Sequence, residues 1–507
     1  MPTTSALPEG WESCAIGDLC ELINGRGFKK TERSSSGLPI IRIQNLNNYK
    51  AKFNYYNGEY KEQIFVNKGD LLFAWSGTPG TSFGAHIWNG PEGVLNQHIF
   101  RVLNNDNLIR KEYFARAFNH KLIELIAGAH GGVGLRHITK NKLEATQIPL
   151  PPLNEQRRIA DKINELQARS RRAREALETV KPLLDKLRQS VLAAAFRGDL
   201  TAEWRKQSPE VEPASKLLER IRAERRARWE EAELLKMRAK GQEPKNNKWK
   251  AKYKEPEPVD TKELSKLPKG WSWIRLEQCV YDGPTNGYSP KSSDDAKGSL
   301  SLKLSATTTG NFLANENTTK RLYETISPDS NYWLQNGDVL IQRANSLDYL
   351  GTTAVYGGEN NTFIYPDLMM RVRTCLPELS HWIRHWFHSP MGKCYVRDNA
   401  NGIAGNMPKI NGKTVRNALI PVPSIEELQV AVTMVNGLEK QSQNLSSLIN
   451  AQLSRVTDLD RSILAKAFRG KLVPQDPNDE PASVLLERIK TERETPKGKR
   501  KGRKKHG

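Results

Sequence analysis

The chain carries one passage twice, and this repetition limits the folds that it can adopt. Residues 191–222 read VLAAAFRGDLTAEWRKQSPEVEPASKLLERIR, and residues 463–490 contain ILAKAFRGKLVPQDPNDEPASVLLERIK. Both copies contain LAxAFRGxL, a polar spacer with proline, and PASxLLERI followed by a basic residue. Such long-range self-similarity indicates that one structural plan is used twice.

Three further landmarks recur in the same order. LPEGW at 7–11 returns as LPKGW at 267–271, NKGDLLF at 67–73 as QNGDVLI at 335–341, and IPLPPLNE at 148–155 as IPVPSIEE at 420–427. We therefore interpret the chain as two homologous halves. In each half, short apolar runs broken by Gly, Asn, Asp and Ser predict a mixed α/β domain between the LPxGW and IPxP elements.

In the first domain, residues 39–43 and 70–75 read as strands, and residues 111–128 read as a helix that ends at Gly128.

The segment after each IPxP element predicts a long helix with an apolar seam. From Ile159 to Val191 the seam positions alternate at spacings of four and three, and the register returns 272 residues later. Helices of about 40 residues are roughly 60 Å long, and their apolar stripes predict that they pack together. The seam residues that we expect to pack are Ile163, Leu166, Leu177, Leu184, Leu187, Val435, Leu438, Ile449, Val456 and Leu459.

Proline and glycine mark where these helices bend and end. Pro182 predicts a kink or a local break in the first long helix, because proline lacks the amide proton of a helical hydrogen bond. Gly198 and Gly470 each suit the left-handed position that follows a helix. The PASxLLERI segments then open further helices, the first reaching about Lys240.

These features divide the chain into six segments. We predict α/β domains at 1–153 and 267–423, and long spacer helices at 154–200 and 424–472. A charged helix with a Pro- and Lys-rich linker fills 201–266, and a short helix with a basic tail fills 473–507. The predicted fold class is α+β.

The charge of the chain points to a polyanionic partner, most simply nucleic acid. Net charge is +21, with a sequence pI near 9.6. The cysteines form no CxxC pair and suggest no disulfide framework, so reduced thiols in the cytoplasm fit best. The first residues lack the pattern of a signal peptide, and no apolar run approaches the ~20 residues of a membrane span.

Known catalytic motifs do not fit this sequence. NMPKINGKT at 406–414 resembles a phosphate loop but has Met407 where the motif requires glycine, and GGVGLRH at 131–137 ends in histidine where a dinucleotide-binding loop needs glycine. HExxH and the Asn-Pro-Pro-aromatic tetrapeptide of adenine methyltransferases are absent. We therefore expect neither a catalytic centre nor a metal site.

The duplicated order of α/β domain, IPxP element, heptad helix, LAxAFRGxL and PASxLLERI resembles the specificity subunit of type I restriction-modification enzymes. This resemblance implies two target recognition domains, separated by a pair of long antiparallel coiled-coil helices in a pseudo-two-fold internal repeat. It implies that the subunit is not itself catalytic. Expected partners are double-stranded DNA, two modification (methyltransferase) subunits and restriction subunits. S-adenosylmethionine, ATP and Mg are expected on those partner subunits.

Internal comparison adds one expectation about the DNA target. The halves match in the helices and at the domain edges, but residues 41–56 share little identity with residues 302–317. Two different domains on a repeated frame should read two different half-sites, so the predicted target is bipartite and asymmetric.

Two loops per domain are candidates for DNA contact, because their Arg, Lys, Asn and Ser side chains suit base edges and phosphates. One follows the GD strand, at 76–81 and 342–346, and the other precedes the IPxP element, at 130–140 and 401–413. The candidate DNA-binding residues are Asn45, Ser76, Thr78, Arg136, His137, Lys140, Arg343, Asn345, Ser346, Asn406, Lys409 and Lys413. The alternative is that these Gly-rich segments are only turns. For the whole chain, the alternatives are a self-sufficient restriction endonuclease or methyltransferase, and a coiled-coil scaffold protein.

Overall fold

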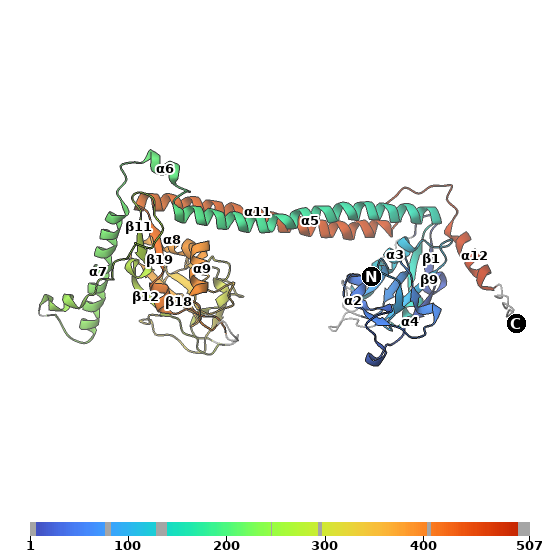
Figure 1. The fold of residues 1–507 in the computed structure, drawn as a ribbon, viewed down its shortest axis with the longest axis horizontal. Helices are drawn as coiled ribbons and strands as arrows, with labels where there is room; N and C mark the ends of the chain where they lie inside the picture. The colour runs from blue at the N-terminus through green and yellow to red at the C-terminus, as the bar shows by residue number, and fades with distance from the viewer. Residues whose placement is uncertain are drawn as a thin grey trace. The chain divides into compact units, whose positions relative to one another are not determined.

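A computed structural model describes residues 7–76, 83–127, 139–244, 246–292, 297–402 and 407–494, and the chain divides into two compact units. Unit 1 comprises residues 1–178 and 450–507, and unit 2 comprises residues 179–449. Each unit contains one α/β domain and a stretch of both long helices (Figure 1). The predicted mixture of α/β domains and long helices is confirmed, whereas the domain boundaries stay predictions.

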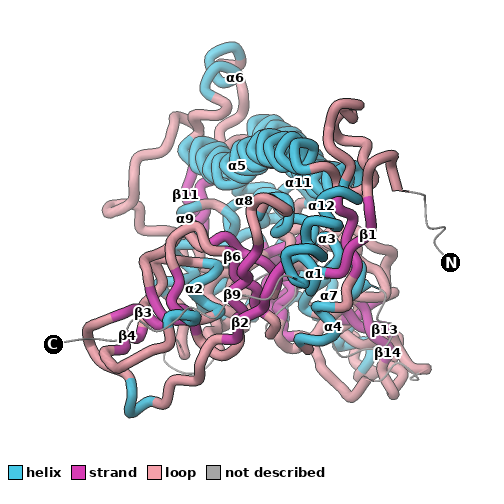
Figure 2. The backbone as a smooth tube through the Cα atoms, turned by 90° about the vertical axis from the view of Figure 1, so that its right-hand side faces the viewer, coloured by secondary structure: helices cyan, strands magenta, loops and turns pink. Residues whose placement is uncertain are grey.

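The domain of unit 1 is built from three small sheets. Among the described residues, their strand orders are β2-β9-β6-β7, β4-β3-β8-β5 and β1-β10. Helix α3 (Lys111–Ala127) packs against β7 (Gly84–Ile87), and its apolar side chains join the core of the first sheet. Figure 2 labels the backbone of α3 and of strands β2, β6 and β9. The strands are β1 (Glu12–Ala15), β2 (Cys20–Asn24), β3 (Leu38–Ile41), β4 (Asn54–Tyr56), β5 (Phe65–Val66), β6 (Leu71–Ala74), β7 (Gly84–Ile87), β8 (Gly93–Leu95), β9 (Ile99–Asn104) and β10 (Gln147–Leu150).

The domain of unit 2 repeats this design with sheets of order β12-β18-β15-β16, β14-β13-β17 and β11-β19 in the described residues. The β11-β19 pair matches β1-β10, because LPxGW precedes the first strand and the IPxP element forms the second. The strands are β11 (Ser272–Arg275), β12 (Val280–Asn286), β13 (Leu300–Leu302), β14 (Thr319–Arg321), β15 (Val339–Gln342), β16 (Thr353–Val355), β17 (Phe363–Ile364), β18 (Met369–Thr374) and β19 (Leu419–Val422).

The helices agree with most of the sequence-based expectations. The long spacer helices are α5 (Leu153–Arg197) and α11 (Ile425–Ala467), and the PASxLLERI segments open α7 (Ala214–Ala239) and α12 (Ala482–Glu494). The others are α1 (Ile16–Leu19), α2 (Ile43–Asn47), α3 (Lys111–Ala127), α4 (Lys140–Glu144), α6 (Ala202–Gln207), α8 (Pro377–His388), α9 (Pro390–Asp398) and α10 (Gly412–Arg416). Short 3-10 turns lie at Lys30–Glu32, Glu62–Ile64, Asn247–Lys252, Leu276–Cys279 and Leu304–Ala306.

In each unit the stretches of α5 and α11 run antiparallel. In unit 1, an ion pair of 3.2 Å joins Arg174 to Asp460, and Arg158 nearer the start of α5 pairs with Asp479 beyond the end of α11. In unit 2, Arg188 pairs with Glu439 at 3.0 Å, and Thr201 just after α5 donates to Glu427 near the start of α11. Higher residue numbers on α5 therefore pair with lower residue numbers on α11, as in antiparallel helices.

The predicted seam is buried at some positions and open to solvent at others. Ile163, Val435 and Ile449 are buried, and Leu166, Leu177, Leu184 and Val456 are half-buried. Leu187, Leu438 and Leu459, which are also expected to pack, are 54%, 36% and 54% exposed, although Leu187 and Leu438 line one apolar hollow between the two helices. Their side chains are therefore only partly covered. The physical reason is that two helices cover each other along one line only, so leucines beside that line stay in contact with solvent.

The bend and end signals have different outcomes. Helix α5 continues through Pro182, so the predicted break is not present. Gly198 and Gly470 do take the left-handed conformation, with φ of 77° and 65°. After α5, the amides of Gly198 and Asp199 donate to the carbonyls of Ala195 and Ala194, and the same pair of bonds follows α11. Both caps are confirmed.

Each repeated helix end packs against the LPxGW element of the other half. A Cβ placed on Gly198 would lie 2.6 Å from Pro268 Cγ, and one on Gly470 would lie 2.3 Å from Pro8 Cγ. The PAS segments make the same exchange, since Ala214 N donates to Gly270 O and Ala482 N donates to Gly10 O, at 2.7 and 2.9 Å. The duplicated motifs are therefore packing elements that join the start of one half to the end of the other.

Candidate nucleic-acid interface

The two loops predicted in the second domain lie side by side. Residues 342–346 follow strand β15, and residues 401–413 precede strand β19. Ala344 forms a β-bridge with Lys409, Asn345 N donates to Pro408 O at 3.2 Å, and Ile410 N donates to Arg343 O at 2.8 Å. Loops that are distant in sequence thus form one surface, which we call loop surface 2 (residues 342–346 and 407–413).

Loop surface 2 is polar and positively charged. Lys409 and Lys413 are exposed, and Lys413 lies in the first turn of α10. Ser346 is also exposed, while Asn345 is half-buried and donates its amide proton to Gln342 Oε1 at 2.7 Å. Exposed lysines and hydroxyls at one edge of a sheet provide contacts for phosphate oxygens.

Arg343 is a half-buried arginine of this surface. Its Nη1 donates to Asp367 O at 3.3 Å, and its Nε is buried without a hydrogen-bond partner in the part of the chain that the structure describes. The donors left for a ligand are therefore the remaining Nη protons of the guanidinium, because the Nε is buried. Such a fork matches the two acceptors of a guanine edge or a pair of phosphate oxygens.

The corresponding loops of the first domain lie mostly outside the described residues. Thr78, Arg136 and His137 fall there, as does Asn406 of the second domain. Ser76 is half-buried just beyond β6, and Lys140 opens α4 with its Nζ donating to Leu22 O at 2.9 Å. Lys140 also lies 3.6 Å from Glu144, so part of its charge is already balanced. Their contact with DNA stays a prediction.

Asn45 differs in its surroundings from the other candidates. Its side chain is 0% exposed, accepts from Arg42 N at 3.1 Å and donates to Ala51 O at 3.3 Å. These two bonds fix the loop after β3, because the Asn45 side chain pairs with the amide of Arg42 and the carbonyl of Ala51. In this structure Asn45 holds the loop from within and is not on a surface that a duplex can reach.

An arginine pair in the first domain was not predicted from the sequence. With the Asn54 amide oriented by its neighbours, its oxygen accepts from Arg33 at 3.2 Å and from Arg42 at 3.3 Å. Burial, together with the nearby charge of Arg33, lowers the pKa of Arg42. Two guanidiniums on one neutral acceptor favour an anion nearby. Only the density of Arg and Lys over residues 26–52 hints at this pair in the sequence.

Two observations on the described residues concern metal ligands and thiols. These residues contain no cluster of three or more His, Cys, Asp or Glu side chains that could hold a metal ion. Burial raises the pKa of the Cys279 thiol well above its usual value and that of Cys375 to about 12, so neither forms a thiolate near neutral pH. Within the same residues, no helix combines the length and apolar content needed to cross a membrane.

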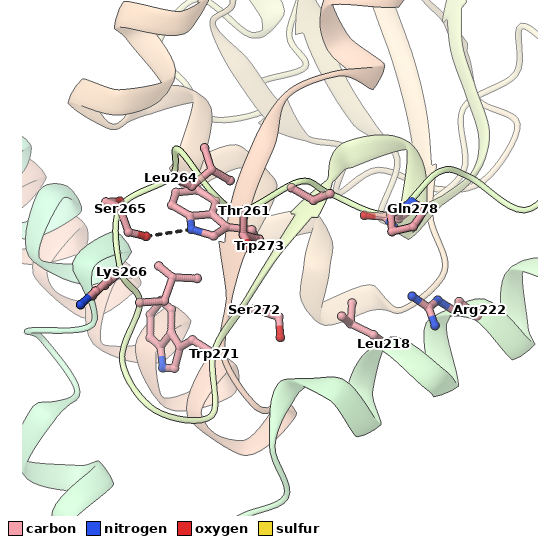
Figure 3. Close-up of a pocket in the computed structure, with 13 residues that line it drawn as sticks. Leu218, Arg222, Thr261, Leu264, Ser265, Lys266, Trp271, Ser272, Trp273 and Gln278 are labelled. Atoms are coloured by element: carbon pink, nitrogen blue, oxygen red, sulfur yellow. Dashed lines mark hydrogen bonds between the residues drawn. The ribbon is translucent and has the colours of Figure 1, made fainter.

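A cavity of about 560 Å³ lies in unit 2 between α7, residues 258–267 and β11 (Figure 3). Trp271 and Trp273 line it, and Trp273 Nε1 donates to Ser265 O at 3.1 Å. Arg222 from α7 and Gln278 also contribute to its wall. Its mixture of indole, aliphatic and scattered polar groups provides no acid, base or nucleophile arranged for a reaction.

LPxGW serves packing in both halves. Trp11 and Trp271 are 5% and 8% exposed. In the first half, Trp11 Nε1 donates to Glu155 at 2.9 Å. In the second half, the repeat equivalent of Glu155 is Glu427, which accepts hydrogen bonds from Thr201 and Arg205. The Arg205 guanidinium lies over the Trp271 ring. These tryptophans therefore join the domains to the helix ends and are not part of the candidate interface.

Comparison with known proteins gives a consistent result along the whole chain. A family model described as type I restriction modification DNA specificity domain matches residues 8–179. The specificity subunit of the type I restriction enzyme EcoKI from Escherichia coli K12 is 26% identical and covers 98% of this chain and 99% of its own length. The EcoBI specificity subunit from Escherichia coli is 25% identical, with 99% and 96% covered.

Solved structures show that the fold is shared. A chain from a type I R-M system, studied for its complex assembly and conformational transition, has a TM-score of 0.64 at 19% identity and covers 92% of this chain and 100% of its own. The HsdS subunit from Thermoanaerobacter tengcongensis has a TM-score of 0.50 at 19% identity, with 93% and 99% covered. The family-model match over residues 8–179, the similarity along the whole chain and the shared fold show that this chain is similar from end to end to type I restriction enzyme specificity subunits.

Proposed function

We propose that this chain supplies the DNA sequence specificity of a type I restriction-modification complex. It would bind a bipartite, asymmetric target in double-stranded DNA and direct adenine methylation or cleavage by its partner subunits. The observation that carries this proposal is that the two domains share the same sheet design but differ in the side chains of the loops at the strand ends. In the second domain, loop surface 2 presents Arg343, Lys409 and Lys413. Two domains with the same sheets and different loop side chains suit two different half-sites.

The chemistry of the complex would belong to other subunits. Modification subunits would bring S-adenosylmethionine for methylation, and restriction subunits would bring ATP and Mg. The chain itself would act in the cytoplasm as a non-catalytic subunit. This division of labour is supported by the relatives, which are named as specificity subunits.

The long helices offer surfaces for two modification subunits. In unit 2, Leu183 and Leu187 on α5 are more than half exposed, and so is Leu448 on α11, with Leu445 also exposed. Rows of exposed leucine on a helix mark sites of protein association. One of these leucines recurs in the repeat: Leu459 on α11 is the equivalent of Leu187 and is equally exposed. The equivalents of Leu183, Leu445 and Leu448 are Arg455, Ala173 and Ala176, so the two helices match at this surface only in part.

The two alternatives make different demands on the molecule. A self-sufficient restriction endonuclease or methyltransferase needs a nuclease or cofactor motif, and the sequence fits none of those tested. A coiled-coil scaffold explains α5 and α11 but leaves two divergent α/β domains and a net charge of +21 without a role.

The proposal is tested by methylation of a mixed-sequence DNA substrate. The purified chain is combined with its modification subunit and S-adenosylmethionine, and methylated adenines are mapped by sequencing. We expect methylation at one bipartite motif only when this chain is present. Equal sequence specificity without the chain would refute the proposal, and methyl transfer by the chain alone would favour the enzyme alternative.

A further inference from the structure

The two domains present matching backbone positions at the edge where the candidate loops begin. Gly25 N donates to Ile99 O at 3.0 Å in the first domain, and Gly287 N donates to Met369 O at 3.1 Å in the second. One strand further along each sheet, Trp75 N donates to His98 O and Arg343 N donates to Leu368 O, at 3.3 and 2.9 Å. These shared bonds align Trp75 with Arg343, Gln97 with Asp367 and His98 with Leu368.

In the first domain this edge carries a polar cluster that the sequence did not reveal. Gln97 Nε2 lies 3.2 Å from His98 Nε2, the His98 ring packs edge-on against Trp75 at 5.2 Å, and Trp75 Nε1 donates to Asn24 at 3.3 Å. Gln97 and Asn24 are exposed, and His98 is half-buried. His98 Nδ1 is buried and has no partner among the described residues.

Gln97 keeps the hydrogen-bonding groups that recognise a base. If its amide nitrogen donates to His98, its second amide proton and its Oε1 remain for a ligand. A Cβ on Gly27 would lie 2.6 Å from that Oε1, so the glycine leaves room for the amide to extend over the backbone. The geometry therefore offers one donor and one acceptor side by side at the start of the loop that follows β6.

The matching edge of the second domain has different chemistry. Asp367 accepts from Ser289 Oγ at 2.5 Å through its carboxylate and from Arg343 Nη1 at 3.3 Å through its carbonyl, and Leu368 contributes no polar group. Arg343 is half-buried, and its guanidinium makes one hydrogen bond within the described structure, from Nη1 to Asp367 O. Its Nε is buried, so the remaining Nη protons are the donors that a ligand could reach. One edge presents an amide, and the other presents a guanidinium.

We propose that Gln97 reads the adenine of an A·T pair in one half-site, and that Arg343 reads the guanine of a G·C pair in the other. Glutamine pairs with the N6 and N7 edge of adenine, and arginine pairs with the O6 and N7 edge of guanine. This inference rests on the proposed function and adds the base type that each domain selects.

The test maps the methylated motif of the reconstituted complex on a random-sequence DNA library. Gln97→Ala should reduce discrimination at one A·T position by roughly 5- to 150-fold, and Arg343→Ala should do the same at one G·C position of the other half-site. Gln97→Glu should shift preference toward cytosine, whereas Arg343→Gln should shift it toward adenine. Asn107→Ala and Arg397→Ala replace an exposed amide and an exposed arginine elsewhere in the two domains, and should leave the motif unchanged.

The outcomes separate this inference from the proposed function. If the wild-type complex methylates one motif and the Gln97 and Arg343 variants methylate that motif unaltered, base reading by these residues is wrong while the function stands. Equal loss of methylation at every sequence would assign the side chains to phosphate contact and would also overturn the inference. A wild-type complex without sequence preference would overturn both. A shift of base preference at a single position of one half-site is the supporting result.

Discussion

Replacing Glu439 with alanine should destabilise unit 2 strongly, because this carboxylate neutralises buried positive charge. Glu439 on α11 is 8% exposed, with Arg384 Nη1 at 2.9 Å and Arg188 at 3.0 Å. Burial raises the pKa of Glu439, but the positive charges of Arg384, His385 and Arg188 outweigh it and hold that pKa below its usual value. The carboxylate is therefore charged at neutral pH.

The size of the effect follows from what the substitution leaves behind. The Arg384 side chain is 4% exposed, so Glu439→Ala leaves a guanidinium buried without its counter-ion. Breaking a buried pair in this way costs about 3–5 kcal/mol. We expect Glu439→Gln to cost less, since it keeps hydrogen bonds, and a Glu439→Leu, Arg384→Met double variant to recover most of the loss.

Hydrogen exchange in native conditions measures this effect for each unit separately. The free energy of opening is followed on peptides from α8 in unit 2 and from α3 in unit 1. Gln167, the repeat equivalent of Glu439, is neutral and serves as the matched control, with Gln167→Ala expected to cost under about 1 kcal/mol. A loss below about 1 kcal/mol in α8 for Glu439→Ala would refute the buried ion-pair argument.

Three further predictions test the packing, the titration and the charge of the chain. Gly198→Ala and Gly470→Ala should each destabilise the protein by more than about 1 kcal/mol, because φ is positive and Pro268 or Pro8 blocks the new Cβ. In contrast, Gly437→Ala on α11 meets open space and should stabilise by about 0.5–1 kcal/mol in thermal unfolding. Burial lowers the pKa of His385 to about 3 and that of His388 well below its usual value, so both stay neutral when folded. Below pH ~6.5 these histidines bind protons in the unfolded chain but not in the folded one. As the pH falls, the unfolding free energy of unit 2 should therefore decrease by about 1.4 kcal/mol per pH unit for each histidine. His385→Gln should make this slope smaller. DNA affinity should weaken steeply with salt, and Lys409→Ala should lower the slope of log K against log salt by about one if Lys409 contacts a phosphate.

Local signals in the sequence predict the long elements well. The heptad spacing identifies α5 and α11, and the two glycine caps end them where expected, because helix periodicity and left-handed glycine depend on neighbouring residues. The same local reasoning is wrong about a break at Pro182, because α5 continues to Arg197 past the missing amide proton, while the alternative of a kink stays a prediction. Exposure of Leu187 and Leu459 depends on how many helices share the seam, which spacing does not specify.

The candidate site was predicted only in part, because its neighbours are set by tertiary contacts. The polar loops of the second domain were recognisable, but their bridge through Ala344 and Lys409 joins segments far apart in sequence. Asn45 looks like a surface amide until its bonds to Arg42 and Ala51 are seen. Gln97 and His98 follow an ordinary strand, and only the pairing of β9 with β6 and β2 brings them to the loop edge.

Exchange of one recognition domain tests the central claim most directly. Residues 1–150 are replaced with the equivalent domain of a relative that has a different target, and the methylated motif of the reconstituted complex is mapped. The account predicts that one half-site changes while the other half-site stays the same. A change in both half-sites, or in neither, would contradict the claim that each domain reads its own half of the target.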